Sequence, residues 1–254
     1  MNAAGFEQSI AALDISLFKV QSETTFDDRR SLLAIQNAVR AGRKDYVYLE
    51  CGSHIGGSLL PHVLDPRCRI AYSVDKRPQA QHDERGYSHP YPGNSSHRMM
   101  ATLAREAPAE SLAKVRTFDV DASELTASQV AEKPDLVMID AEHTNTAVFS
   151  DFLSIYRHCH PATVYAFHDA NLVFSGLRNI EAFLRYSSVP FDSYVLPSVV
   201  FVLAPNEARD VLRPVGERFA IGKQEFEIKA RNHIISKHYD LVRMHLANQA
   251  KRGT

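Results

Sequence analysis

The segment of residues 46–58 constrains the fold of this chain more than any other part of the sequence. It reads Tyr-Val-Tyr-Leu-Glu-Cys-Gly-Ser-His-Ile-Gly-Gly-Ser, an apolar run followed at once by a turn rich in glycine. Glycine lets the backbone bend tightly and lets a ligand approach where a Cβ atom would block it. The pattern therefore predicts a short buried strand, a glycine turn and the start of a helix.

Strand and helix patterns alternate along the rest of the chain. Alternation of this kind predicts a parallel sheet with right-handed crossovers. Only Pro197 and Ser198 separate the last two apolar runs, so these should form a hairpin. The expected fold class is α/β: a Rossmann-like, doubly wound, seven-stranded sheet, mostly parallel with a C-terminal antiparallel hairpin strand, and with helices on both faces. The predicted strands lie near residues 46–50, 70–74, 114–118, 135–139, 163–167, 193–197 and 199–204.

The two ends of the chain differ from this alternating centre. We expect an N-terminal helical cap over residues 1–45, a core over 46–205 and a C-terminal helical extension over 206–254. Within the core, residues 77–97 are polar and broken by prolines and glycines, so they predict a long loop at the ligand end of the sheet. This loop is a candidate substrate lid. The last helix, expected near 226–249, would allow a homodimer through the terminal helices.

Composition and charge exclude several classes of protein. The 254 residues are 44% hydrophobic and 23% charged, which suits one globular α/β domain with additions. The formal net charge of −1 provides no basic field, so no nucleic-acid partner is expected. We see neither a membrane-length apolar run nor a secretion signal, so no membrane partner is expected. Three cysteines without disulfide or metal spacing favour a cytoplasmic location.

An acid follows the glycine turn at an informative distance. Asp75 ends the predicted strand 70–74 and lies nineteen positions after Gly56 (75 minus 56). In doubly wound folds, an acid about 20 residues after the glycine turn binds the ribose hydroxyls of a cofactor. The alternative is that the glycine turn binds no ligand and only connects the strand to the helix. Together, the two features favour an adenosine-containing cofactor.

Glu50 narrows the identity of that cofactor. The pattern Glu-x-Gly-x-x-x-Gly over Glu50, Gly52 and Gly56 differs from the Gly-x-Gly-x-x-Gly of a dinucleotide fold. A carboxylate at the strand end would repel a pyrophosphate, whereas it suits an ammonium or sulfonium group. We therefore predict that S-adenosylmethionine binds here. A nicotinamide-dependent oxidoreductase is disfavoured for the same reason.

Two acids follow the third predicted strand. Either Asp119 or Asp121 could accept a hydrogen bond from the adenine amino group. The structural alternative is that Asp121 or Ser123 caps a helix predicted near residues 124–131. Asp121 could do both, so the two interpretations stay open.

Acids and histidines end the fourth and fifth predicted strands. Asp140 ends one strand, and His168 and Asp169 end the next. Because adjacent parallel strands end at the same edge of a sheet, these side chains should lie within reach of one ion. Oxygen ligands with one nitrogen suit Mg²⁺ or Mn²⁺. The alternative is that Asp140 and His168 bond to each other or cap the helices that follow them.

His143 is the candidate general base. It lies three residues beyond Asp140, at the start of a helix expected over residues 145–158. A histidine that titrates near neutral pH beside a bound hydroxyl could accept its proton, although a surface or capping role is the alternative. On that helix, Asp151 should be solvated or bonded near His143. The predicted catalytic residues are thus His143 and Asp140.

Together, these motifs resemble those of the class I S-adenosylmethionine-dependent methyltransferases. Within that class, the chain looks like the metal-assisted O-methyltransferases of catechols and of sugars in natural-product pathways. The resemblance covers about residues 45–205, and it implies divalent metal ligands at Asp140, His168 and Asp169. The predicted cofactor-binding residues, from the pattern and the resemblance together, are Glu50, Gly52, Ser53, Gly56, Asp75, Asp119, Asp121 and Asp140.

The sequence departs from that family in two places. His160 to Thr163 replace the usual glycine pair before the fifth strand, and His168-Asp169 stands where an Asp-Asn pair is frequent. The predicted function is O-methylation of a hydroxyl on a small molecule with divalent-metal assistance. The two departures favour the alternative, a non-catalytic methyltransferase-fold module for binding or assembly.

Overall fold

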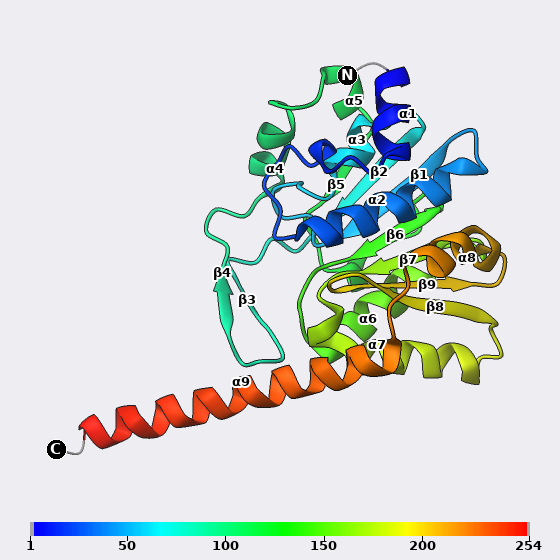
Figure 1. Ribbon diagram of the computed structural model, residues 1–254. Helices are drawn as coiled ribbons and strands as arrows, with labels where there is room; N and C mark the ends of the chain where they lie inside the picture. Colours follow the sequence, from blue (N-terminus) through cyan, green and yellow to red (C-terminus); the bar gives the residue numbers. More distant parts are fainter. Residues whose placement is uncertain (1–2, 253–254) are drawn as a thin grey trace.

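The computed structural model describes residues 3–252, so the first two residues of the predicted N-terminal cap and the last two of the C-terminal extension lie outside it. At its centre is a seven-stranded sheet in the order β5-β2-β1-β6-β7-β9-β8 (Figure 1). The first five strands of this order are parallel, whereas β9 runs antiparallel to both β7 and β8. The predicted fold class is confirmed. The strands are β1 (Tyr46–Cys51), β2 (Cys68–Val74), β5 (Val115–Phe118), β6 (Leu136–Ile139), β7 (Val164–Phe167), β8 (Phe191–Leu196) and β9 (Val200–Pro205).

Helices cover both faces of this sheet. Because two layers of helices exclude water from them, the central strands β1, β6, β7 and β9 are buried along their whole length. The helices that pack on one face are α2 (Phe26–Ala41), α3 (Leu60–Leu64), α4 (Ser96–Leu103) and α8 (Ala208–Phe219). Those on the other face are α6 (Asn145–Tyr156) and α7 (Ala170–Tyr186). The shorter helices are α1 (Ala3–Ala11), η1 (Ile15–Leu17), α5 (Ala109–Leu112) and η2 (Ala122–Glu124).

Helix α2 begins at Phe26 because Thr25 and Asp28 form a capping box. The Thr25 Oγ1 atom accepts a hydrogen bond from the Asp28 N–H group at 3.2 Å, and Asp28 Oδ2 accepts one from the Thr25 N–H group at 2.8 Å. Asp28 is buried, and its other carboxylate oxygen accepts a hydrogen bond from the N–H group of Val199. The start of α2 is thereby fixed against the C-terminal hairpin of the sheet.

Two local predictions differ from the structure. No α-helix forms over residues 124–131; instead the short helix η2 is followed by turns, because the Gln129 side chain accepts the N–H group of Thr126 and competes with helical bonding. The predicted loop over 77–97 contains a separate hairpin, β3 (Ala80–His82) with β4 (Ser88–Pro90), and the start of α4. Its role as a lid stays a prediction.

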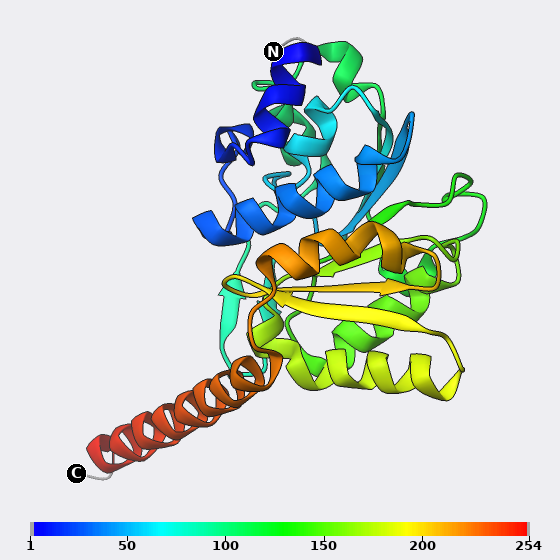
Figure 2. The same ribbon diagram turned by 45° about the vertical axis from the view of Figure 1, so that its right-hand side comes forward.

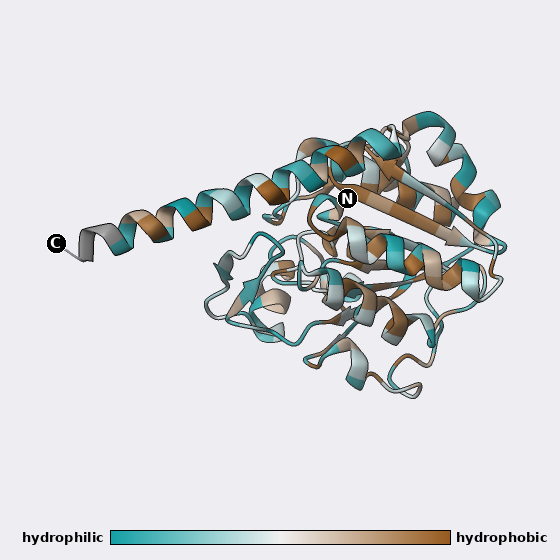
Figure 3. Ribbon diagram, turned by 90° about the horizontal axis from the view of Figure 1, so that it is seen from below, coloured by the Kyte–Doolittle hydropathy of each residue, from teal (hydrophilic) through white to brown (hydrophobic). Residues whose placement is uncertain are grey.

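The last helix, α9 (Lys223–Arg252), extends away from the body of the molecule (Figures 1 and 2). His238 Nε2 lies 2.7 Å from the main-chain oxygen of Glu84, which ties α9 to the β3–β4 hairpin. Apolar and polar residues alternate along α9 (Figure 3). The predicted homodimer would use this surface and stays a prediction. No helix among residues 3–252 is both long and apolar enough to cross a membrane. The most exposed apolar side chains of α9 are Ile228, Ile235, Tyr239, Val242, Met244 and Leu246.

Candidate functional site

The carboxyl ends of the parallel strands frame a cleft of about 570 Å³, a volume that includes space open to solvent. Main-chain hydrogen bonds hold these strand ends in register: Gly52 donates to Val74 at 2.8 Å, and Asp140 donates to Cys51 at 2.8 Å. Predicted residues that follow four separate strands, β1, β2, β6 and β7, are therefore brought to one place. Those that line the cleft are Gly52, Ser53, Asp75, Asp140, His143, His168 and Asp169.

Gly52 makes the approach of two strands possible. Its φ angle is +93°, in the region that favours glycine, and a Cβ atom at this position would lie 2.1 Å from the main-chain oxygen of Asp140. Gly57 is similarly confined, since a Cβ atom there would lie 2.5 Å from the main-chain oxygen of Gln21. The glycine turn thus packs directly against the strand that carries Asp140 and against the N-terminal segment.

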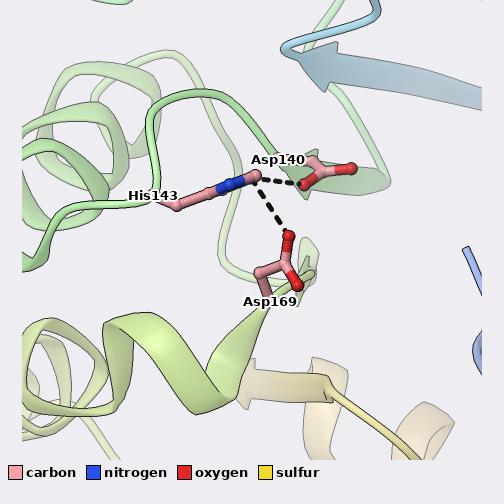
Figure 4. Close-up of side chains that lie close together, drawn as sticks. All are labelled: Asp140, His143 and Asp169. Carbon is pink, nitrogen blue, oxygen red and sulfur yellow. Dashed lines mark hydrogen bonds and ion pairs between the residues drawn. The ribbon is translucent and has the colours of Figure 1, made fainter. Parts of the chain in front are cut away.

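His143 points between two carboxylates at neighbouring strand ends (Figure 4). Its Nε2 atom lies 3.2 Å from Asp140 Oδ1 and 3.3 Å from Asp169 Oδ2. Asp169 itself has a left-handed backbone, with a φ angle of 48°, which is uncommon for a residue other than glycine. Strained backbone of this kind is concentrated at functional sites. The three side chains therefore form one polar cluster at the cleft.

Neighbouring charges shift the pKa values of His143 and Asp140 toward the charged forms. Burial lowers the pKa of His143, but its hydrogen bond to Asp140 and the charges of both carboxylates outweigh burial, so the pKa is raised overall. Burial raises the pKa of Asp140, yet the charge of His168 and the hydrogen bonds from both histidines lower it overall. These contacts therefore favour the charged forms of both His143 and Asp140.

His168 lies behind the cluster, between the N-terminal helix α2 and the sheet. Its Nε2 atom is 3.4 Å from Asp28 Oδ2, and its Nδ1 atom is 3.3 Å from Asp140 Oδ1. Burial lowers the pKa of His168, but the surrounding carboxylates raise it well above its ordinary value. His168 thus links Asp28 to Asp140. Asp28 did not figure among the predicted site residues, and its only sequence signal is that of a helix cap.

The cluster has suitable donors for a divalent cation. Asp140, His143 and Asp169 each offer one ligand atom, and these atoms lie within 4.8 Å of one another. Two carboxylates and one imidazole suit Mg²⁺ or Mn²⁺ with water or substrate oxygens at the remaining positions. The predicted ligand His168 also reaches this cluster, since its Nδ1 atom lies 3.3 Å from Asp140 Oδ1 and 3.5 Å from Asp169 Oδ2, and its role as a ligand stays a prediction. A bound cation would have to compete with the protons on the imidazoles.

Asp75 lies where a ribose-binding acid was predicted, but its carboxylate oxygens already accept hydrogen bonds from neighbouring residues. Oδ1 accepts the Arg77 N–H group at 2.7 Å, and Oδ2 accepts the His54 N–H group at 3.0 Å. The guanidinium of Arg77 adds a further contact to Oδ2 at 3.2 Å. These bonds orient the carboxylate toward the cleft. The remaining acceptor capacity is available to a ligand hydroxyl.

Four predicted cofactor residues are not among those that line this cleft, and three of them, Glu50, Gly56 and Asp119, have other contacts. Glu50 is completely buried and accepts hydrogen bonds from Ser58 at 2.5 Å and Tyr48 at 3.1 Å. Burial raises its pKa to about 8, so Glu50 is mainly a neutral acid at pH 7. Gly56 packs against Leu103, and Asp119 accepts hydrogen bonds from Arg77 and Ser96. Any contact of these three residues with a cofactor stays a prediction.

A second cleft adjoins the first. Asp75 and Gln81 line both, so one extended ligand could occupy the two together. Asp121 lines the second cleft, and its Oδ1 atom accepts the Ser123 N–H group at 3.0 Å and the Ser123 hydroxyl at 2.8 Å. The predicted capping role of Asp121 is therefore confirmed. Asp151 also lines this cleft and is half-buried, and no hydrogen bond joins it to His143.

Two buried polar atoms in the first cleft, Ser53 Oγ and Asn94 Oδ1, have neither a hydrogen bond nor an ion pair within residues 3–252. Buried polar atoms are nearly always paired, so these two atoms are free to bond to a ligand or to water in the cleft. Asn94 belongs to the predicted lid. Nearby, the Tyr91 hydroxyl donates to Glu23 Oε2 at 3.2 Å, which joins the lid to the N-terminal segment across the cleft. Sequence patterns gave no signal for this contact.

Comparisons with known proteins bear on the family and the fold. Residues 49–170 match the model of a family described as a methyltransferase domain. The chain is similar in structure to the calicheamicin methyltransferase CalS11, with 14% identity, a TM-score of 0.50, and 80% of this chain and 94% of that chain covered. A putative caffeoyl-CoA O-methyltransferase from Staphylococcus aureus gives 13% identity, a TM-score of 0.50, and coverage of 79% and 92%. At these identities the two structures show the fold. A search of curated sequences finds no significant match.

Proposed function

We propose that the chain methylates a hydroxyl of a small molecule, because residues 49–170 match the model of a methyltransferase domain and the motifs resemble those of the class I S-adenosylmethionine-dependent methyltransferases. The observation that carries this proposal is the position of His143. It combines a proton-accepting nitrogen with two carboxylates at the mouth of a cleft that also contains the glycine turn. An O-methyltransferase needs this combination, since the hydroxyl must lose its proton as its oxygen attacks the methyl carbon.

Different residues of the chain have different roles in the proposed reaction. S-adenosylmethionine, when bound, supplies the methyl group on a positively charged sulfur. The neutral form of His143 accepts the proton of the substrate hydroxyl, and Asp140 and Asp169 stabilise the imidazolium that results. His168, fixed by Asp28, holds Asp140 in position. The enzyme would act mainly by positioning and electrostatics.

Divalent-metal assistance is part of the proposal. Asp140 and Asp169 would hold the cation, since Mg²⁺ is often bound through one or two carboxylates and otherwise by water or substrate. When bound, a cation supplies positive charge that lowers the pKa of the substrate hydroxyl. His143 would then remain the proton acceptor, because one nitrogen atom does not bind a cation and a proton at once.

The substrate side of the cleft is polar. Glu23 and Tyr91 lie at its mouth, and Asn94 presents an unpaired acceptor inside it. These groups suit a small, hydroxylated substrate. We propose no nucleic-acid or membrane partner, and the cytoplasmic location stays a prediction.

Calorimetric titration with S-adenosylhomocysteine, with and without Mg²⁺, tests the cofactor first. Binding that is lost in Asp75→Ala and retained in Asp210→Ala, a change at an 81% exposed side chain, would support the cofactor site. Methyl transfer from S-adenosylmethionine to a panel of sugars, phenols and other hydroxylated compounds then tests the reaction. His143→Gln should lower turnover far more than cofactor affinity.

The outcomes separate the proposal from its alternative. Turnover that requires His143 supports an O-methyltransferase. Cofactor binding without transfer to any compound of the panel would favour the non-catalytic binding or assembly module. Transfer that is unaffected by His143→Gln would contradict the assigned proton acceptor.

A further inference from the structure

Glu84, in the predicted lid, is bonded to the two peptide groups that follow His143. Its main-chain N–H group donates to the His143 carbonyl oxygen at 3.0 Å. Its side-chain Oε1 atom accepts a hydrogen bond from the Asn145 N–H group at 2.6 Å. Asp83, the residue before it, forms a parallel β-bridge with His143. The turn of the β3–β4 hairpin is therefore attached directly to the segment that carries the proposed proton acceptor.

The side chain of Glu84 completes the start of helix α6. The first N–H groups of a helix have no acceptor within the helix, and the N-cap residue Thr144 accepts from Ala147 rather than from Asn145. Glu84 supplies the missing acceptor, and the helix dipole favours a carboxylate at this end. Asn145 is also held by α7, since its Oδ1 atom accepts the Gly176 N–H group at 2.7 Å. The start of α6 is thus fixed both by α7 and by the predicted lid.

The hairpin turn that carries Glu84 is itself held in place. The buried Asp83 carboxylate accepts hydrogen bonds from the main-chain N–H group of Arg85 at 2.8 Å and from its guanidinium at 3.0 Å. His238 Nε2 of helix α9 donates to the Glu84 carbonyl oxygen at 2.7 Å, and the hairpin lies beside α9 (Figure 1). The main chain of Glu84 therefore provides a fixed support for the segment that contains His143.

The position of His143 is demanding because its side chain contacts two carboxylates at once. Its Nε2 atom lies 3.2 Å from Asp140 Oδ1 and 3.3 Å from Asp169 Oδ2. Misplacement of a reacting group by about 1 Å can lower the rate of an enzyme about a hundredfold. Glu84 is not among the residues that line the two clefts, so its effect on the reaction would pass through His143.

We propose that Glu84 is a positioning residue, which holds the main chain after His143 so that the imidazole stays within reach of the substrate hydroxyl. The inference rests on the proposed function, in which His143 accepts the proton of that hydroxyl. It gives the predicted lid a role in the reaction besides covering the substrate. Of the two bonds that Glu84 makes to this segment, a substitution can remove only the one from the Asn145 N–H group to the carboxylate.

The first test measures methyl transfer by full-length variants, with S-adenosylmethionine and whichever compound of the panel wild type methylates fastest. Glu84→Ala should lower kcat about tenfold, while KM for the cofactor and the affinity for S-adenosylhomocysteine change less than about twofold. Glu84→Gln keeps an oxygen that can accept the Asn145 N–H group, so it should restore most of kcat. His82→Ala, at an exposed position of β3, is the control and should leave kcat unchanged.

Hydrogen exchange of the Asn145 amide tests the bond itself, without any substrate. Followed by nuclear magnetic resonance, the exchange should be about tenfold faster in Glu84→Ala than in wild type, because the acceptor is gone. In Glu84→Gln it should stay close to the wild-type rate. Glu84→Leu repeats the removal of the acceptor with a longer side chain in case alanine unfolds the hairpin, which thermal unfolding would reveal.

The outcomes distinguish this inference from the proposed function. A lower kcat and faster Asn145 exchange in Glu84→Ala or Glu84→Leu, both restored by Glu84→Gln, support the positioning role. An unchanged kcat, an unchanged exchange rate, a loss that Glu84→Gln does not restore, or an equal loss in His82→Ala overturns it and leaves the proposed function intact. A wild type that methylates no compound of the panel overturns the proposed function, and the role of Glu84 with it.

Discussion

The main-chain oxygen of Asp140 lies 2.1 Å from the place where a Cβ atom on Gly52 would be. Two strands of the sheet therefore approach each other at the cleft more closely than any other residue type at position 52 allows. Because this Cβ atom would meet main-chain atoms of Asp140, a change of side-chain rotamer cannot relieve the contact. The cleft depends on this approach, because Asp140 belongs to the polar cluster and the glycine turn forms the facing wall.

Gly52→Ala should therefore be strongly destabilising. Both the close contact and the φ angle of +93° oppose a side chain, and we expect a loss of about 3 kcal/mol or more in the free energy of unfolding. Urea denaturation followed by circular dichroism measures it. Gly42→Ala is the matched control, because nothing lies within 4 Å of its Cβ position, and it should change stability by less than about 1 kcal/mol. Equal effects of the two changes would contradict the prediction.

Metal affinity should depend on the two carboxylates next to His143. Asp140→Asn and Asp169→Asn each remove a negative charge from the cluster, so we expect each to weaken Mn²⁺ binding by at least about tenfold. Electron paramagnetic resonance of free Mn²⁺ in a titration measures the affinity. Asp210→Asn, on the exposed surface of α8, should leave it unchanged. Identical affinities in all three variants would place any bound ion elsewhere.

Glu50 should make the protein less stable as the pH rises. Its folded-state pKa of about 8 lies above the ordinary value of 4.5, so the folded protein holds this proton more tightly than the unfolded chain. The resulting stabilisation is complete below pH 4.5 and is lost as the pH rises toward 8, by about 1.4 kcal/mol per pH unit. Glu50→Gln removes this dependence.

Urea denaturation of wild type and Glu50→Gln at pH 5, 6, 7 and 8 tests this pH dependence of the free energy of unfolding. The stability of Glu50→Gln relative to wild type should increase by about 3 kcal/mol over that range. Glu225→Gln, on the surface of α9, is the control, because the pKa of Glu225 is lowered from 4.5 by Lys229 and its titration falls below this range. A constant difference between wild type and Glu50→Gln would show that Glu50 is ionised when folded.

Arg40 should be the most important charged residue for stability outside the cleft. Its side chain is 2% exposed, and it binds Asp65 at 2.9 Å and Glu7 at 2.7 Å. Arg40→Ala would leave the buried carboxylate of Asp65 without its cation, which costs about 3–5 kcal/mol. Arg30→Ala on the same helix removes a 61% exposed partner of Asp27 and should cost less than about 1 kcal/mol. Chemical denaturation compares the two, and equal losses would refute the distinction.

The sheet could be predicted from the sequence because its strands are buried on both faces. Such strands are continuous apolar runs, and the prediction for 163–167, for example, differs from β7 (Val164–Phe167) by one residue. The hairpin over 80–90 could not be predicted in this way. Its strands are polar and half-exposed, and its turn depends on hydrogen bonds from Arg85 to the Asp83 carboxylate.

In the candidate site, too, some residues could be predicted from the sequence and others could not. Asp140 and Asp169 were predictable because parallel strands of one sheet end at the same edge, so a residue after one strand lies close to a residue after the next. The role of His168 was not, because its orientation depends on Asp28, 140 positions earlier in the chain (168 minus 28). No local pattern reports a contact over that separation.

The sequence by itself therefore determined the order of strands and helices, the glycine turn and the side chains that follow each strand. Those features depend on the periodicity and conformational freedom of neighbouring residues. Only the tertiary structure decided that His168 Nε2 lies beside Asp28 and that Glu50 is buried as an acid. These outcomes depend on packing, burial and hydrogen bonds between segments that are distant in the chain, and such terms are set only when the chain is folded.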